Sequence, residues 1–226
     1  MSNYPVVLTH LESGAVVIGG GEVAARKVEG LLMAGAGVTV ISPQLVPALE
    51  ALVAQGRITA LRRAYQPGDL ARARLVIAAT DDPQVNQAVW QEARERDCLV
   101  NVVDDPAHCT FHVPAVVRRG MVTIAVGTGG ASPALAKSLR RKIEADTGPE
   151  YEQLAALLSE LRPQVQASIP ADKRAALGRE LMDALLPLVR DGKRAQARQT
   201  AKEILERAGD QATADDLSQA GERKEM

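Results

Sequence analysis

The sequence predicts an α/β protein with a Rossmann-like parallel-sheet domain, followed by a small α+β dimerisation segment and a C-terminal helical domain. Three observations predict this class. Short apolar runs alternate with helical patterns up to about residue 103, a strand-then-helix segment follows, and only amphipathic helical patterns come after residue 148. We expect the boundaries at residues 1–113, 114–147 and 148–226. The middle segment is too small to fold alone, so we expect it to pack on a second copy of the chain.

The first predicted βαβ unit has three consecutive glycines between its first strand and its helix. The apolar run 16–18 stops at these glycines and a helical pattern begins at Glu22. The spacing Gly19-x-Gly21-x-x-Ala24 fits the dinucleotide fingerprint: Gly19 makes the turn, Gly21 lets a pyrophosphate approach the backbone, and Ala24 packs the helix on the strand. Because α/β domains that bind no nucleotide also use such turns, the glycines alone leave both interpretations open.

The second predicted strand, residues 38–41, ends without the expected acid. Ser42 and Pro43 stand where an NAD-binding unit usually carries an Asp or Glu for the ribose 2′-hydroxyl. Main-chain groups around Pro43 and Gln44 could replace that carboxylate. The residue types at this position therefore do not separate NAD from NADP.

Polar residues follow the predicted strands 75–79 and 99–103. Thr80, Asp81 and Asp104 fall at the carboxyl ends of these strands, where open parallel sheets bind ligands. Asp104 and Asp105 form a pair of carboxylates that could accept a proton or bind a cation. The alternatives are structural: Asp81 or Asp82 could cap the next helix, and the pair could be solvated turn formers.

The remainder of the chain is predicted to be mostly helical. Ser132 and Pro133 are suited to open a helix that runs to about residue 145, whose Lys and Arg side chains either attract carboxylates or populate a solvated face. Prolines and glycines then predict three further helices and a polar tail. These are residues 150–161, 170–188 with an interruption at Pro187, 195–208, and the tail 209–226, with turns at Pro163, Pro170 and Gly192.

Composition excludes several classes of function. The net charge of -1 gives no electrostatic reason to expect nucleic acid or an acidic membrane as a partner. Residues 1–11 contain no charged-then-apolar leader, and no apolar run approaches the ~20 residues of a membrane span, so we expect a cytoplasmic protein. Cys98 and Cys109 lack metal-ligand spacing.

The apolar segment 4–8 is expected to cover the sheet edge.

Four separated motifs resemble one family. They are GGGEVAARK (19–27), AATDD (78–82), NVVDD (101–105) and GGASPALA (129–136). In order and spacing they are similar to the precorrin-2 dehydrogenase / sirohydrochlorin ferrochelatase family, the N-terminal type of siroheme synthase, over about residues 4–145. The resemblance implies a homodimer in which NAD accepts hydride from precorrin-2 to give sirohydrochlorin. Some members then insert ferrous iron. No counterpart of the methyltransferase half of fused siroheme synthases is present in the sequence, so methylation of uroporphyrinogen is not expected.

The resemblance also implies site residues. Asp104 matches the family's essential aspartate and would bind iron transiently if the chain is a chelatase. The substrate is a carboxylate-rich tetrapyrrole, which would give exposed basic residues a purpose. The residues implied for the cofactor are Gly19, Gly21, Glu22, Val23, Ser42, Pro43, Gln44, Thr80, Asp81 and Val102. Those implied for the substrate are Asp105, His112, Ser132, Arg118 and Lys137. Two alternatives from other classes are an NAD-sensing regulatory module and a tetrapyrrole-binding protein without chemistry.

Overall fold

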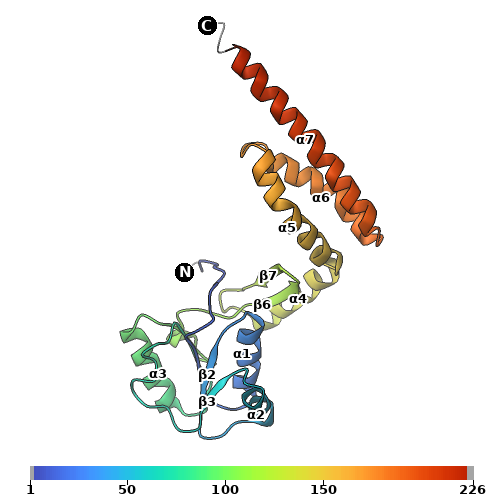
Figure 1. Ribbon diagram of the computed structural model, residues 1–226. Coiled ribbons are helices and arrows are strands. Elements are labelled where there is room, and N and C mark those ends of the chain that lie inside the picture. The colour runs from blue at the N-terminus through green and yellow to red at the C-terminus, as the bar shows by residue number, and fades with distance from the viewer. Residues whose placement is uncertain (1–2, 223–226) are drawn as a thin grey trace. The chain divides into compact units, whose positions relative to one another are not determined.

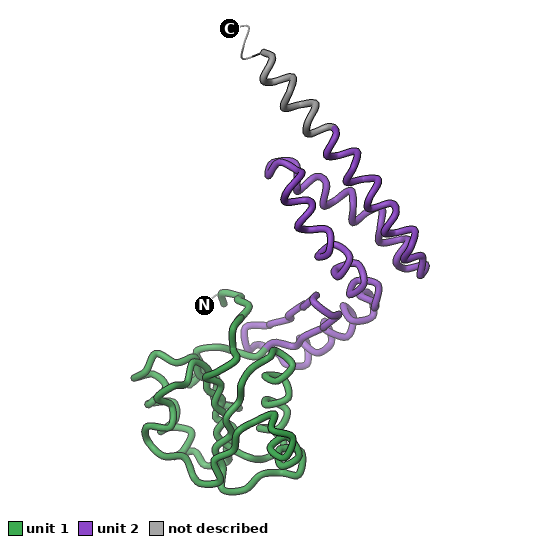
Figure 2. Tube along the Cα trace, viewed as in Figure 1, with its two compact units in different colours: residues 1–113 green, residues 114–226 purple. Residues whose placement is uncertain are grey.

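The computed structural model describes residues 3–222, with side chains described for residues 3–210. The chain divides into two compact units, residues 1–113 and 114–226 (Figure 2). The first unit contains a parallel sheet with helices. The second contains a hairpin and four helices, which are labelled with the other elements in Figure 1.

The first unit is built on five parallel strands in the order β3-β2-β1-β4-β5. Every residue of β1 and β4 is buried, as expected for strands covered on both faces. Because the strand order reverses between β1 and β4, the crevice for a ligand lies at their carboxyl ends. The strands are β1 (Ala15–Ile18), β2 (Val38–Ile41), β3 (Thr59–Leu61), β4 (Leu75–Ala78) and β5 (Leu99–Val102).

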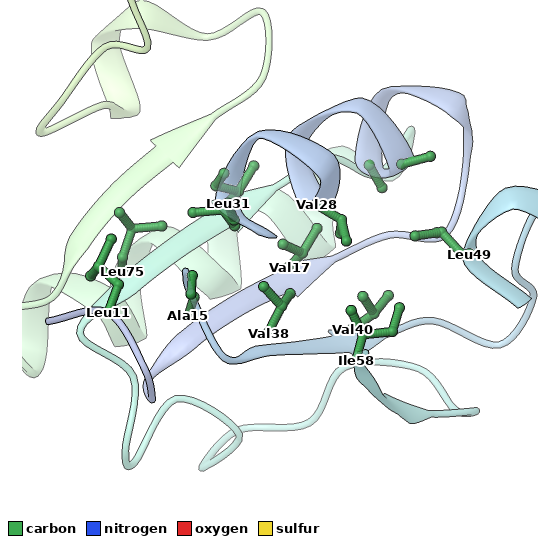
Figure 3. Packing of buried hydrophobic residues seen from close by; sticks show 14 residues of the cluster. Leu11, Ala15, Val17, Val28, Leu31, Val38, Val40, Leu49, Ile58 and Leu75 are labelled. Atoms are coloured by element: carbon green, nitrogen blue, oxygen red, sulfur yellow. The ribbon is translucent and has the colours of Figure 1, made fainter. Parts of the chain in front are cut away.

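Three helices and a short 3-10 helix complete the first unit: α1 (Glu22–Met33), α2 (Pro47–Ala54), α3 (Pro83–Glu95) and η1 (Pro106–His108). Val28 and Leu31 of α1 point toward Val17 of β1 (Figure 3). On the other face, Val89 and Ala93 of α3 belong to a second core cluster. Each buried Val or Leu contributes roughly 1.5–3 kcal/mol. The predicted Rossmann-like class is confirmed.

The N-terminal segment does not cover the sheet edge, so that prediction is wrong. Tyr4, Val6 and Val7 are 89%, 64% and 83% exposed. Residues 3–10 form neither helix nor strand, and the chain joins the hydrophobic core only at Leu11. An apolar composition alone did not distinguish a buried strand from this exposed segment.

A buried carboxylate fastens the connection between β3 and β4 to helix α3. Glu92 of α3, which is 8% exposed, accepts hydrogen bonds from the Tyr65 hydroxyl, from Gly68 N at 3.0 Å and from Leu70 N at 3.2 Å. Arg96 Nε donates a further bond of 2.7 Å. Burial raises the pKa of Glu92, but these hydrogen bonds outweigh it and leave the pKa below its usual range.

The second unit begins with an antiparallel hairpin, β6 (Ala115–Arg119) and β7 (Val122–Val126), packed on α4 (Pro133–Asp146). Ser132 caps α4 as predicted, because its Oγ accepts a bond from Leu135 N at 3.1 Å. Arg119 fastens the hairpin to the other end of α4. Its Nε donates to Thr147 O at 2.9 Å and its Nη2 to Glu144 O at 3.2 Å.

The rest of the second unit is helical: α5 (Glu150–Ser168), α6 (Arg174–Arg190) and α7 (Arg194–Glu222). Leu157, Leu181 and Ala201 lie in the core that these helices share. The predicted interruptions at Pro163 and Pro187 are wrong, since both prolines lie inside helices. Each proline lacks the backbone N–H that would donate a hydrogen bond within the helix. Tertiary packing of the helices compensates for this lost bond. The predicted polar tail is helical through Glu222, and its last residues, 223–226, lie outside the described residues. No helix among residues 3–222 is long and apolar enough to cross a membrane.

Candidate functional site

The three glycines that follow β1 differ in the space around them: the first two are closely packed and the third is open. Gly19 has φ +117°, and a Cβ there would lie 2.2 Å from Ala79 O. A Cβ on Gly20 would lie 1.9 Å from Gln44 O. At Gly21 no heavy atom lies within 4 Å of the Cβ position. The first two glycines therefore serve the fold, while the third leaves room for a ligand.

The same turn presents the amino terminus of α1. Gly21 is the N-cap and has no side chain to accept a bond from the first turn, and the first intrahelical bond runs from Ala25 N to Gly21 O at 3.0 Å. The N–H groups of Glu22 and Val23 precede that bond. Free N–H groups at a helix amino terminus bind phosphate. The turn therefore fits the pyrophosphate of a dinucleotide.

The loop after β2 approaches this turn. Val46 N donates to Gly20 O at 2.9 Å, and the Ser42 hydroxyl donates to Gln44 O at 2.8 Å. The hydroxyl of Ser42 therefore shapes the loop, and Pro43 and Gln44 are its exposed members. This arrangement leaves main-chain groups of the loop beside the glycines, where the sequence lacks a ribose-binding acid.

The polar residues after β4 divide into one cap and one exposed side chain. Asp82 Oδ1 accepts bonds from Gln84 N at 2.8 Å and from Val85 N at 3.3 Å, so Asp82 caps α3. Thr80 Oγ1 accepts a bond from Asp82 N at 2.9 Å. Asp81 makes no capping bond and is exposed. Of the two residues considered as caps, Asp82 takes that role and Asp81 stays available to a ligand.

A small cavity of about 120 Å³ lies beside the ends of β4 and β5. Asp105 Oδ2 lies 2.5 Å from His108 Nδ1, and the His108 ring meets Trp90 edge-on. Asn86 Nδ2 donates to Thr80 O at 2.9 Å, while its buried Oδ1 has no partner among the described residues. The sequence patterns gave no reason to select Asn86. The cavity is lined by Pro83, Asn86, Gln87, Val102, Asp105 and His108.

Asp104 follows β5 in an unusual backbone conformation. Its φ of +61° lies in the left-handed region, and the turn is closed by a bond from Asp105 N to Val102 O at 3.3 Å. Such a conformation costs a non-glycine residue roughly 1–2 kcal/mol, although Asp tolerates it better than most. Its carboxylate is exposed and receives no hydrogen bond from the described residues. Strain of this kind concentrates at functional sites.

Cys109 contacts this turn, and Lys27 interacts electrostatically with Asp104 and Cys109. The Cys109 thiol lies 3.2 Å from Asp105 O and 3.3 Å from Val102 N, so it links the two ends of the turn. Burial raises the pKa of this thiol. Burial and the charge of Arg26 lower the pKa of Lys27, against the opposing influence of Asp104 and Cys109. Lys27 belongs to the motif 19–27, which gives no sign of an electrostatic interaction with a residue about 80 positions later.

The sheet topology places the main predicted residues of the first unit at one edge. Gly19, Thr80 and Asp104 follow the carboxyl ends of β1, β4 and β5, which are adjacent in the sheet. His112 is exposed near the end of this unit. The remaining predicted substrate residues belong to the second unit: Arg118 and Lys137 are exposed and Ser132 is the α4 cap.

Comparisons with known proteins agree with this geometry. Residues 7–115 match a putative NAD(P)-binding family, and residues 119–146 match the central region of sirohaem biosynthesis proteins. The first unit is thus an NAD(P)-binding domain of Rossmann type. A solved structure titled SirC, precorrin-2 dehydrogenase, has a TM-score of 0.73 at 27% identity and covers 89% of this chain and 100% of its own.

Curated relatives narrow the family. The siroheme synthase of Methylobacillus flagellatus is 46% identical over 166 residues, which are 74% of this chain and 36% of the relative. That of Thioalkalivibrio sulfidiphilus is 41% identical over 208 residues, 91% of this chain and 42% of the relative. The chain thus spans less than half the length of these relatives. This similarity to siroheme synthases agrees with the family that the four motifs resemble.

Proposed function

We propose that the chain oxidises precorrin-2 to sirohydrochlorin with NAD as the hydride acceptor. The observation that carries this proposal is the placement of an open glycine turn and an unpartnered carboxylate, Asp104, at one edge of the parallel sheet. The family and the SirC structure support the same reaction. In the alternative of an NAD-sensing module, Asp104 would have no task.

The residues around the glycine turn would hold the cofactor. The N–H groups of Glu22 and Val23 would receive the pyrophosphate, with Gly21 leaving space for it. The loop at Pro43 and Gln44 would meet the adenosine ribose through main-chain groups, and the cofactor residues after β4 and β5 would meet the nicotinamide half. When bound, NAD supplies a two-electron acceptor for a hydride.

Asp104 would accept the proton that balances this hydride. Oxidation of precorrin-2 removes one hydride and one proton, and an exposed carboxylate can take the proton directly. The left-handed backbone projects Asp104 from a fixed turn, because Val103 N and Asp105 N are bonded to Ala78 O and Val102 O. Asp104 is therefore a reacting group with a fixed backbone.

Binding of the tetrapyrrole would depend on positive and polar groups. Arg118 and Lys137 are exposed cations suited to its carboxylates, and Asp105, His112 and Ser132 would contact its polar groups. We assign the active form to a cytoplasmic homodimer joined through residues 114–147. Leu135 and Leu139 of α4 support this assignment, because they are 51% and 41% exposed on one helix face.

Ferrous iron insertion is the second activity proposed for this site. As Fe²⁺ enters the macrocycle, two pyrrole nitrogens lose their protons. Asp104 would bind the ion transiently and, on releasing it, accept one of these protons, and solvent water would take the other. The carboxylate suits that task because no hydrogen bond from the described residues occupies its oxygens. Iron is thus a substrate in this proposal.

Sequential anaerobic assays test both activities. Precorrin-2 is incubated with the protein, with and without NAD, and Fe²⁺ or Co²⁺ is then added while absorbance reports each step. We expect sirohydrochlorin only with NAD, followed by the metallated product. Tight NAD binding without oxidation would replace the proposal with a sensing module. Equal substrate binding with and without NAD, again without oxidation, would indicate a tetrapyrrole-binding protein.

A further inference from the structure

The segment that follows β5 carries a carboxylate–imidazole pair beside the small cavity. Asp105 Oδ2 lies 2.5 Å from Nδ1 of His108, and His108 N donates to Asp105 O at 3.2 Å. Side chain and backbone thus both tie His108 to the residue that directly follows Asp104. The two side chains are 42% and 31% exposed, so solvent screens this pair less than it screens a pair in open water.

Trp90 of α3 contacts the imidazole ring from a second element. The ring centroids of Trp90 and His108 are 4.3 Å apart and the ring planes meet at 78°, which is a favourable edge contact. The guanidinium carbon of Arg94 lies 5.0 Å from the centroid of the same indole, and this cation–π contact holds the indole in turn. The imidazole is therefore oriented by a carboxylate of its own turn and by an aromatic ring of α3.

One ring nitrogen of His108 is occupied and the other is open. Nδ1 faces Asp105, whereas Nε2 makes no hydrogen bond with any residue among 3–210. In a neutral imidazole whose Nδ1–H is donated to a carboxylate, Nε2 keeps a lone pair that can accept a proton. His108 lines the cavity beside the ends of β4 and β5. This is the arrangement in which a carboxylate orients a histidine base.

Iron insertion releases more protons than Asp104 alone can accept. The proposed oxidation gives up one proton beside the hydride, and one carboxylate is sufficient for it. Metal insertion instead breaks two pyrrole N–H bonds, and the carboxylate of Asp104 can hold one of the two protons. The pair of Asp105 and His108 begins at the very next residue, so the chain places a second base directly after the first.

We propose that His108 is the second proton acceptor of iron insertion and that Asp105 orients it. As Fe²⁺ forms bonds to two pyrrole nitrogens, their N–H bonds break. One proton goes to the Asp104 carboxylate when it releases the ion, and the other goes to Nε2 of His108, which passes it on to solvent water. Asp105 stabilises the imidazolium that exists in between, and no electron is transferred. This inference rests on the proposed iron insertion.

The experiment measures two anaerobic rates on each protein sample: oxidation of precorrin-2 with NAD, and insertion of Fe²⁺ into sirohydrochlorin after subtraction of the protein-free rate. We expect His108→Gln to lower the ratio of insertion to oxidation about tenfold, because an amide cannot take the proton. Asp105→Asn should lower the ratio about threefold, because one tautomer is no longer fixed. His10→Gln is the matched control, since His10 also lies near a carboxylate, 3.5 Å from Glu12, but is exposed and outside the site.

The ratio separates this role from a structural one, because a loss of folded protein lowers both rates equally. An unchanged ratio in His108→Gln, or an equal fall in His10→Gln, would overturn the assignment of His108. An unchanged ratio in Asp105→Asn would overturn the orienting role of the carboxylate. A wild type that oxidises precorrin-2 but inserts iron no faster than the protein-free control would overturn the second activity together with this inference, and would leave the proposed oxidation standing.

Discussion

The fold treats two carboxylates of the first unit, Glu92 and Asp104, in opposite ways. Glu92 is buried and accepts bonds from a hydroxyl, a guanidinium and two backbone N–H groups. Asp104 is exposed on a left-handed residue and accepts none from the described residues. The oxygens of Glu92 are occupied by hydrogen bonds within the fold, whereas those of Asp104 can still accept hydrogen bonds from a ligand.

Two glycines of the β1–α1 turn repeat this contrast. Gly19 is required by the chain itself, since a Cβ would collide with Ala79 O. Gly21 has an ordinary φ of -84° and open space around it. Residues that the fold needs and residues that the ligand needs are thus separable by substitution, which the following predictions use.

The largest expected effect is on catalysis by Asp104. Asp104→Asn removes the proton acceptor but keeps a residue that tolerates the left-handed region, so we expect turnover of precorrin-2 to fall by about 10²–10⁴-fold with little change in unfolding free energy. Asp97→Asn is a matched control, because Asp97 is also exposed and left-handed, at φ +54°. Similar turnover in the two variants would contradict the assignment of Asp104.

Glu92→Gln should give the next largest effect, on stability. The amide retains one acceptor oxygen and places an NH₂ among donors, so the free energy of unfolding should fall by about 2–4 kcal/mol in urea denaturation. Glu95→Gln, an exposed position on the same helix, should change it by less than about 0.5 kcal/mol. Equal midpoints for the two variants would show that the Glu92 bonds contribute little.

Gly21→Ala should weaken NAD binding without unfolding the chain. The added methyl group meets no protein atom but occupies the approach of the pyrophosphate, so we expect about a tenfold rise in Kd by fluorescence titration. Gly19→Ala should instead lower stability, because its Cβ would lie 2.2 Å from Ala79 O. Unchanged NAD affinity in a folded Gly21→Ala protein would contradict the proposal that the pyrophosphate binds at this turn.

The smallest effect concerns pH. The pKa of Glu92 is lowered in the folded state. Its ionised form therefore contributes fully to folding stability above the ordinary glutamate pKa of about 4.3, and this contribution is lost as pH falls further. Burial and the bond to Glu92 raise the pKa of Tyr65, whose contribution is lost as pH rises above about 10. The stability difference between wild type and Glu92→Gln should therefore narrow at acidic pH. A constant difference down to pH ~2 would contradict this linkage.

Local sequence patterns were sufficient for much of the fold. Apolar runs located β1, β2, β4 and β5, because buried parallel strands are nearly continuous in hydrophobic residues. Ser132 was identified as a helix cap from its type and the following proline, and Asp82 was one of two candidates. Pro163 and Pro187 misled, because tertiary packing decides whether a helix continues through a proline.

The site was predictable only where it lies on a motif. Gly19 and Asp104 could be selected by spacing and by position after a strand. The hydrogen bond from Tyr65 to Glu92 and the electrostatic influence of Asp104 on Lys27 involve residues far apart in sequence, so no local pattern encodes them. Whether a carboxylate oxygen already accepts a hydrogen bond within the fold depends on such long-range partners. For that reason the sequence did not distinguish the structural carboxylate from the chemical one.

The most direct test measures NADH formed per folded chain when precorrin-2 and NAD are mixed anaerobically with wild type, Asp104→Asn and Glu92→Gln. The temperature is kept below the unfolding midpoint of all three proteins. We predict equal rates for wild type and Glu92→Gln, and a rate at least about a hundredfold lower for Asp104→Asn. A wild-type rate in Asp104→Asn, or an equally slow Glu92→Gln, would contradict the division of roles between the two carboxylates.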